Sequence, residues 1–298
     1  MPTDIEYSAL LESWVLALRA ERKSPATIKS YTDGVRGLFA WCDEQGAARE
    51  PTRASVNGYI AALLDSGKQP ATARSRQLGI RRFTRWLADE GEIEADPLVG
   101  LKPPKLDAPI VEPLSDAELK ALIQACAGKE FRDIRDTAIV RLMAETGIRA
   151  GECAVIALDD LDLMAGTVVV RRGKGGKGRV VPIGPQTVQA LDRYRRRRAG
   201  HALAGLPSLW LGERKRGFTY DALHKALEGR AKAAGIAGFH PHKLRHTAAH
   251  RWLAAGGSEG GLMAVAGWTR PDMLQRYTKA RAAERAAVES RSLNLGDI

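Results

Sequence analysis

Five prolines between residues 97 and 113 divide this chain of 298 residues into two parts. Proline has no backbone N–H donor and biases the residue before it towards extended backbone, so no helix is expected to cross this segment. The sequence therefore predicts a first domain over residues 1–100, a linker over residues 101–113 and a second domain over residues 114–298.

The first domain has the hydrophobic period of helices and no convincing strand. Helices are expected at about residues 5–21, 25–44, 53–66 and 70–90. Two of them resemble each other, because the run that begins at Pro25 recurs from Pro70. Hydroxyl and basic side chains on their opening turns suit a helix end beside phosphates, although two ordinary amphipathic helices remain the alternative. The candidate DNA contacts here are Thr27, Lys29, Ser30, Thr72, Arg74, Arg76 and Arg81.

The second domain combines helices with one short β-hairpin. Ser115 and Glu118 form a capping-box pattern ahead of a helix, and another helix is expected at residues 133–146. Two valine-rich runs at residues 167–170 and 180–183 flank a glycine-lysine turn, which predicts a hairpin. Helices are expected from residue 185 onward. The fold class is therefore mainly α with a small β-sheet or hairpin, an α+β arrangement.

The charge of the chain favours a polyanionic partner. Its formal net charge is +11 and its pI is about 9.8, and the excess of basic residues lies in the second domain. Such a balance is typical of proteins that bind nucleic acid. The run from Arg193 to Arg198 suits either contact with a DNA backbone or a solvated helix face, and the sequence leaves both open.

Several classes of protein are not expected. Cys42, Cys126 and Cys153 are unclustered, so they predict reduced core thiols and neither a disulfide frame nor a metal site. The first residues carry no secretion signal, and no apolar run is long enough to span a membrane. We therefore expect a cytoplasmic protein that needs no membrane.

Each remaining motif is weak by itself. Tyr277 shares a predicted helix face with apolar residues, which usually indicates a core tyrosine, and Lys174 lies in a glycine turn where most lysines are merely solvated. The spacing of His242 and Arg245 arises readily by chance. The order of the motifs carries the information: Thr146-Gly147-Ile148-Arg149-x-x-Glu152, Gly173-Lys174-Gly175, His242-x-x-Arg245-His246, Gly267-Trp268 and Tyr277.

This ordered set closely resembles the tyrosine recombinase (phage integrase) family, in particular its two-domain Xer-like and Cre-like members. The resemblance implies that Arg149 and Arg245 bind the scissile phosphate, since guanidinium groups bind phosphate oxygens bidentately. It implies Lys174 as the general acid, His242 in proton transfer, Trp268 as a phosphate donor and Tyr277 as the nucleophile. Glu152 would hold an arginine or the histidine, and His246 would support the site. Lys177, Arg179 and Lys243 are further DNA contacts.

The resemblance also implies the assembly: a C-shaped clamp around duplex DNA that carries an inverted-repeat core site, a tetramer of two dimers, and a second recombinase as a candidate partner. No metal and no cofactor are expected, because the arginines and the lysine supply the positive charge. Trp268 stands where the family more often has histidine. The alternatives are a DNA-binding protein of the same fold that does not cleave, and a type IB topoisomerase.

Overall fold

The computed structural model of the protein describes residues 7–106, 112–171, 178–213 and 217–268, together with residues 270, 274 and 291. Lys174, Lys177 and Tyr277 lie outside the described residues, as does the turn of the predicted hairpin. The chain divides into two compact units between Pro109 and Ile110, inside the segment predicted to be the linker.

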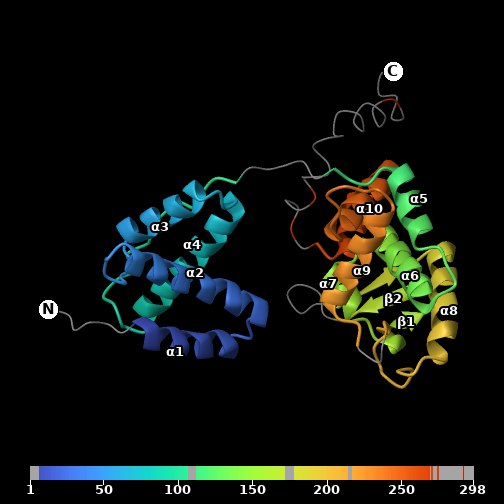
Figure 1. The fold of residues 1–298 in the computed structure, drawn as a ribbon, viewed down its shortest axis with the longest axis horizontal. Helices are drawn as coiled ribbons and strands as arrows, with labels where there is room; N and C mark the ends of the chain where they lie inside the picture. The colour runs from blue at the N-terminus through green and yellow to red at the C-terminus, as the bar shows by residue number, and fades with distance from the viewer. Residues whose placement is uncertain are drawn as a thin grey trace, which may run out of the picture. The chain divides into compact units, whose positions relative to one another are not determined.

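In its described residues the first unit has four helices (Figure 1): α1 (Tyr7–Ala20), α2 (Pro25–Glu44), α3 (Arg53–Asp65) and α4 (Pro70–Asp89). Proline occupies the first turn of α2 and of α4, where its missing N–H leaves no helical hydrogen bond unmade. Both helices are followed by a glycine in left-handed backbone, Gly46 with φ of 64° and Gly91 with φ of 76°. These signals explain why the predicted helix bounds are confirmed within two residues.

The core of this unit lies where α2 and α4 cross. Trp14 and Phe83 are buried with their ring centroids 5.2 Å apart, and leucine and valine side chains surround them. The two helices approach at glycines. A Cβ atom on Gly34 would lie 2.5 Å from the carbonyl oxygen of Arg76, and one on Gly79 would lie 2.5 Å from that of Tyr31. Backbone atoms cannot rotate away, so these glycines set how closely the helices pack.

Gly34→Ala is therefore expected to lower the free energy of unfolding by about 1–3 kcal/mol, the usual cost of overpacking a tight core. Gly229→Ala is the matched control, because Gly229 lies in helix α9 and a Cβ there meets nothing within 4 Å. That control should gain up to about 1 kcal/mol from helix propensity. Chemical denaturation followed by circular dichroism measures both, and an unchanged Gly34→Ala protein would contradict the close approach.

The second unit surrounds a small antiparallel sheet with helices (Figure 1). The strands, in the order β1-β2-β3, are β1 (Leu161–Asp162), β2 (Thr167–Val170) and β3 (Arg179–Pro182), with Val168 opposite Val181. The predicted hairpin strands are confirmed, whereas the two-residue β1 was not predicted. The helices are α5 (Asp116–Ala125), α6 (Phe131–Thr146), α7 (Ala150–Ala154), the 3-10 helix η1 (Leu158–Asp160), α8 (Pro185–Ala199), α9 (Tyr220–Ala233), α10 (His242–Ala254) and α11 (Glu259–Ala266).

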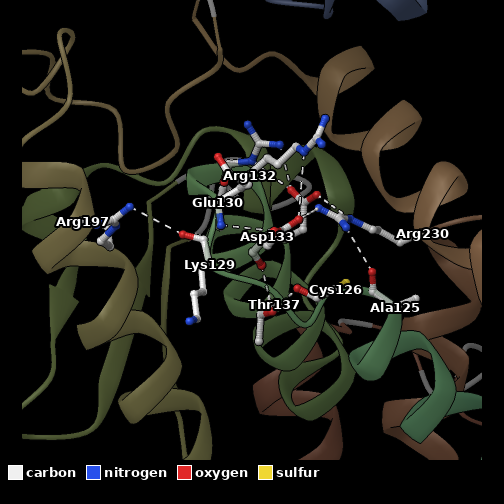
Figure 2. A network of polar contacts seen from close by, with 11 residues as sticks. Ala125, Cys126, Lys129, Glu130, Arg132, Asp133, Thr137, Arg197 and Arg230 are labelled. Carbon is white, nitrogen blue, oxygen red and sulfur yellow. Dashed lines mark hydrogen bonds and ion pairs between the residues drawn. The ribbon is translucent and has the colours of Figure 1, made fainter.

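Arg230 joins three helices of this unit (Figure 2). Its guanidinium, on α9, donates to the Ala125 carbonyl on α5 at 3.0 Å and to Asp133 and Asp136 on α6 at 2.7 and 2.9 Å. Burial by itself raises the pKa of the Asp133 carboxyl, but the hydrogen bonds from Arg230 and from the Glu130 N–H, together with nearby arginine charges, outweigh burial and leave that pKa below its ordinary value. The two ion pairs and the hydrogen bond of Arg230 therefore hold α5, α6 and α9 together.

The run of arginines on α8 has a role that the sequence did not reveal. Arg198 is buried and donates to four carbonyl oxygens, those of Leu209, Ala204, Leu206 and Ser208. Arg197 reaches the Lys129 carbonyl at 3.5 Å (Figure 2). Arg198 therefore neither faces solvent nor is available to DNA. Its guanidinium donors bind the backbone carbonyls of the loop that follows α8.

Cys42, Cys126 and Cys153 are free and buried, as predicted. Burial raises the pKa of the Cys126 and Cys153 thiols to about 12 each. Within the described ranges, His, Cys, Asp and Glu side chains form no group of three or more positioned to hold a metal ion. A search of the same residues finds no helix that is both long and apolar enough to cross a bilayer.

Candidate active site

The site begins at the turn between α6 and α7. Gly147 ends α6 in left-handed backbone with φ of 62°, and the Thr146 hydroxyl donates back to the Leu142 carbonyl at 2.6 Å. The same hydroxyl accepts from the Ile148 N–H at 3.3 Å. These bonds turn the chain sharply, so Arg149 stands at the N-terminal cap of α7. The Thr-Gly-Ile-Arg motif is thus a helix stop followed directly by a helix start.

Glu152 is shared between two arginines. One carboxylate oxygen accepts from the Arg149 guanidinium at 2.8 Å, and the other accepts from the Arg149 N–H at 3.1 Å and from Arg179 at 2.8 Å. The carboxylate is 6% exposed, whereas the Arg149 side chain is 24% exposed and that of Arg179 is 11% exposed. The prediction left open whether Glu152 holds an arginine or the histidine, and the structure shows that it holds two arginines.

Glu152 is ionised at neutral pH because of these partners. Burial acts to raise the pKa of its carboxyl, but the hydrogen bonds and charges of Arg179 and then Arg149 outweigh burial and leave the pKa below its ordinary value of 4.5. A buried carboxylate with two guanidinium partners fixes both side chains. Arg179 also donates to the Val265 carbonyl at 2.8 Å, which ties β3 to α11.

Glu152→Gln is expected to lower the free energy of unfolding at neutral pH by about 3 kcal/mol, because it leaves two partly buried arginines without their anion. Since the folded-state pKa is lowered, the pairing stabilises the protein above pH 4.5 and is lost as the pH falls through the lower folded value. The difference from the parent protein should therefore shrink on acidification. Denaturant titrations from pH 7 to pH 3 measure it.

Glu228→Gln serves as the control for this prediction. Glu228 is about half exposed on α9 and pairs only with His224 among the described residues, at 3.2 Å. An exposed pair contributes little, so this variant should follow the parent protein at each pH. Equal stability losses in the two variants would show that the partners of Glu152 do not stabilise the fold.

Arg245 lies at the centre of the site. It projects from α10 and is 2% exposed. Its guanidinium donates to the Gly147 carbonyl at 2.5 Å and to the Ala266 carbonyl at 2.8 Å, and it lies 5.1 Å from the ring centroid of Trp268. A cation above an indole face is attracted by the ring quadrupole. Arg245 thus links the ends of α6 and α11 and packs on buried Trp268.

Histidines gather at the start of α10. His242 is exposed at the first position of the helix, and the ring of His246, which is buried, meets it edge to face with centroids 4.7 Å apart. His240 stacks on His242 with centroids 6.4 Å apart. Burial, followed by the charges of Lys243 and His224, lowers the pKa of His240. The ring of His242 thus lies between those of His240 and His246.

The described site residues meet through backbone carbonyls and one carboxylate. Arg149, Arg245, Trp268, Glu152 and Arg179 are connected by contacts with Gly147, Val265 and Ala266. Gly267 has φ of 66°, and a Cβ there would lie 2.8 Å from the Arg179 guanidinium. The sequence analysis predicted Arg179 only as a DNA contact. Its partners lie far along the chain, so no local signal pointed to them.

Thr247 is a contact that the sequence did not suggest. Its hydroxyl is fully buried, accepts from the Leu114 N–H at 2.9 Å and donates to the Lys243 carbonyl at 2.9 Å. It ties the first residues of the second unit to α10, two positions after Arg245. Lys243 itself is half-buried on the same helix.

In the first unit, the candidate DNA contacts lie on the first turns of α2 and α4, except Arg81, which lies further along α4. The Ser30 and Ser75 hydroxyls are 3.1 Å apart. Asp33 pairs with Lys29 at 2.8 Å and with Arg76 at 3.2 Å. Lys29, Thr72 and Arg74 are exposed, whereas Thr27 and Arg81 are half-buried.

Two family models match the chain. The model of the "Phage integrase family" matches residues 112–284, and that of the "Phage integrase, N-terminal SAM-like domain" matches residues 11–91. Tyrosine recombinase XerD of Mycobacterium leprae is 32% identical over 200 residues, which is 63% of each protein and just under two thirds of that recombinase. Tyrosine recombinase XerC of Chromobacterium violaceum is 31% identical over 259 residues, covering 86% of this chain and 85% of that protein.

Solved structures share the fold. A XerH site-specific recombinase bound to a palindromic difH substrate has a TM-score of 0.73 at 15% identity, covering 94% of this chain and 83% of that one. A lambda integrase dimer bound to a core site has a TM-score of 0.71 at 16% identity, covering 89% of this chain and 96% of that one. The fold class predicted from the sequence is thus confirmed.

Proposed function

The chain belongs to the phage integrase family of tyrosine recombinases, and we propose that it exchanges DNA strands site-specifically through a covalent bond between Tyr277 and a 3′ phosphate. The observation that carries the proposal is the meeting of Arg149, Arg245 and Trp268 around the end of α6. Two guanidinium groups beside an indole donor suit a phosphodiester, since planar forks of N–H donors match phosphate oxygens.

The reaction assigns each side chain a part. The Tyr277 oxygen attacks phosphorus, a phosphotyrosyl bond forms, and the bond from phosphorus to the 5′ oxygen breaks. Lys174 gives its proton to that leaving oxygen, and His242 takes part in moving the tyrosine proton. Arg149, Arg245 and Trp268 stabilise the charge on the non-bridging oxygens, which is usually the largest contribution to catalysis.

Strand exchange needs no energy source in this scheme. The phosphotyrosyl bond keeps the energy of the broken phosphodiester, so the free 5′ hydroxyl of another strand reverses the step and rejoins the DNA. Glu152 positions Arg149, and Arg179 holds Glu152 in turn. Both act through another residue and do not touch the phosphate.

The two units take different parts in DNA binding. The first unit, which the SAM-like model matches, binds duplex DNA through Thr27, Lys29, Ser30, Thr72, Arg74, Arg76 and Arg81. The second unit cleaves it, with Lys177 and Lys243 as further contacts, and together the units form a clamp around the duplex. The expected substrate is a core site with an inverted repeat, and the expected assembly is a tetramer. The XerH substrate is palindromic, and lambda integrase has been solved as a tetramer on a Holliday junction.

A suicide duplex tests this function. The protein is incubated with nicked duplexes that carry candidate sites, and a protein–DNA adduct that survives SDS is the expected product. Absence of an adduct would support a DNA-binding protein that does not cleave. An adduct on any duplex, with relaxation of any supercoiled plasmid, would support a topoisomerase. Adducts confined to particular sites identify the substrate sequence.

A further inference from the structure

The first unit contains one helical hairpin twice. Ser30 and Ser75 are 45 residues apart in the sequence. When 45 is added to the residue numbers of α1 and α2, their bounds agree with those of α3 and α4 within one residue. The residues that follow the helices make matching backbone hydrogen bonds. Lys23 and Lys68 each donate to a carbonyl five residues earlier, and so do Ala47 and Glu92, at 2.9–3.0 Å in all four cases. The resemblance of Pro25 and Pro70 thus extends through the whole unit.

The two copies are related by a two-fold axis. Gly34 of one copy approaches Arg76, and Gly79, its equivalent, approaches Tyr31, the equivalent of Arg76. When residue i of one copy contacts residue j of the other, and j of the first contacts i of the second, the two copies are related by a two-fold axis. In a repeat related by translation, the second of these contacts would instead be made with a third copy. Ser30 and Ser75 are equivalent to each other and their hydroxyls are 3.1 Å apart, so the axis passes between them.

A notch opens on this axis. Its volume is about 430 Å³, and α2 and α4 line it with four residues each: Ala26, Lys29, Ser30 and Asp33 from α2, and Ala71, Thr72, Ser75 and Arg76 from α4. Lys29 and its equivalent Arg74 are both exposed, one on each helix. Of these two, Lys29 lines the notch, and Arg74 lies on α4 directly before the lining residue Ser75.

The two copies differ in charge at Asp33. Asp33 binds Lys29 and Arg76, while its equivalent in the other copy is Leu78, which is 43% exposed and carries no charge. Among the described residues no ion pair is found for Arg74. Lys29 on α2 is thus held on a carboxylate, whereas its equivalent on α4, Arg74, is exposed to solvent.

We propose that the first unit binds duplex DNA with this two-fold axis along a local two-fold axis of the DNA, so that α2 contacts the backbone of one strand and α4 the backbone of the other. The inference rests on the proposed recombinase function, which supplies the duplex. Antiparallel strands are exchanged by two-fold axes perpendicular to the helix, and proteins with two-fold symmetry commonly place their axis on one of these. Here one chain supplies both halves.

The arrangement has a consequence for affinity. Lys29 and Arg74 contact phosphates at equivalent positions on opposite strands, and each contact releases condensed counterions. Because Asp33 competes for Lys29, the strand that faces α4 is held more strongly than the strand that faces α2. The asymmetry gives the unit a direction on an otherwise symmetric backbone.

Single-phosphate neutralisation tests the proposal. Full-length protein with Tyr277→Phe, which cannot cleave, is titrated onto the duplex recovered from the covalent adducts, with one phosphate at a time replaced by a methylphosphonate. In this protein, sensitive phosphates are expected on both strands. Arg74→Ala should remove the sensitivity on one strand and Lys29→Ala that on the other, with the two positions related by a two-fold axis of the duplex.

Three further variants sharpen the test. Each of Arg74→Ala and Lys29→Ala should lower the slope of log affinity against log salt by about 1. Asp33→Asn should strengthen binding and increase sensitivity only on the strand that Lys29 contacts. Arg82→Ala is the control, because Arg82 is exposed on α4 but lies eight residues, about two turns, beyond Arg74. Binding by the Arg82→Ala protein should remain sensitive to methylphosphonate replacement on both strands.

Sensitivity to Lys29 and Arg74 on the same strand would overturn the proposal while leaving the recombinase function intact. So would variants that leave every phosphate as sensitive as before. If no methylphosphonate near the site weakened binding even though adducts form there, the first unit would not bind the backbone at all. Failure of the recombinase function itself is recognised earlier, because no adduct would then supply the duplex.

Discussion

Tyr277→Phe is expected to abolish the covalent protein–DNA adduct and to leave duplex affinity nearly unchanged. The substitution removes one hydroxyl, and with it the atom that attacks phosphorus, while the aromatic ring remains. Without that nucleophile, adduct formation should fall below detection. The suicide-duplex assay followed by denaturing electrophoresis measures the adduct, and a gel-shift titration measures the affinity.

Tyr220→Phe is the matched control. Tyr220 begins α9 and is 49% exposed, so the loss of its hydroxyl should change neither adduct formation nor binding. A persistent adduct in the Tyr277→Phe protein would mean that another side chain attacks the phosphate. Sequencing of the DNA-linked peptide from the parent protein then identifies that residue.

Arg245→Ala should have the next largest effect, because Arg245 has two tasks. Loss of a preorganised donor to a developing charge typically slows catalysis by about 10²–10³-fold. The substitution also leaves the buried Gly147 and Ala266 carbonyls without a donor, which costs about 1–3 kcal/mol for each group. Adduct formation should therefore fall steeply, and the midpoint of unfolding should fall with it.

Two comparisons separate the tasks. Arg245→Lys keeps the charge, but a single ammonium group lacks the fork that spans two carbonyls, so stability should recover only in part and the adduct rate should stay low. Arg251→Ala removes an exposed arginine from the same helix, where it lies 3.6 Å from Asp116, and should change little. If Arg245→Ala formed adducts as fast as Arg251→Ala, the phosphate would not depend on Arg245.

Local signals made most of the fold predictable from the sequence. Pro25 and Pro70 mark helix starts, Gly46 and Gly91 mark helix ends, and the Ser115–Glu118 capping box is present as predicted. Each of these depends on residues a few positions apart. The strand β1 escaped notice because two residues give no measurable alternation.

The sequence motifs name the residues of the candidate site but not the contacts between them. Glu152 binds Arg149 three positions away, which a capping pattern anticipates, but it also binds Arg179, whose distance along the chain hides the pairing. Arg198 was hidden in another way. The arginines of the run cannot be told apart by their sequence pattern, but the helix directs the Arg198 side chain into the protein interior.

The exchange of contacts between Gly34 and Gly79 bears on the ancestry of the first unit. A closed two-fold contact between equivalent helices is what two separate copies of the same short peptide would make, so a single hairpin of about this length already carries a surface complementary to itself. The unit can thus be regarded as a homodimer whose subunits became joined in one chain. Once joined, each copy could diverge in sequence. Asp33 and Leu78 occupy equivalent positions in the two copies, and in a homodimer these two positions would have to hold the same residue.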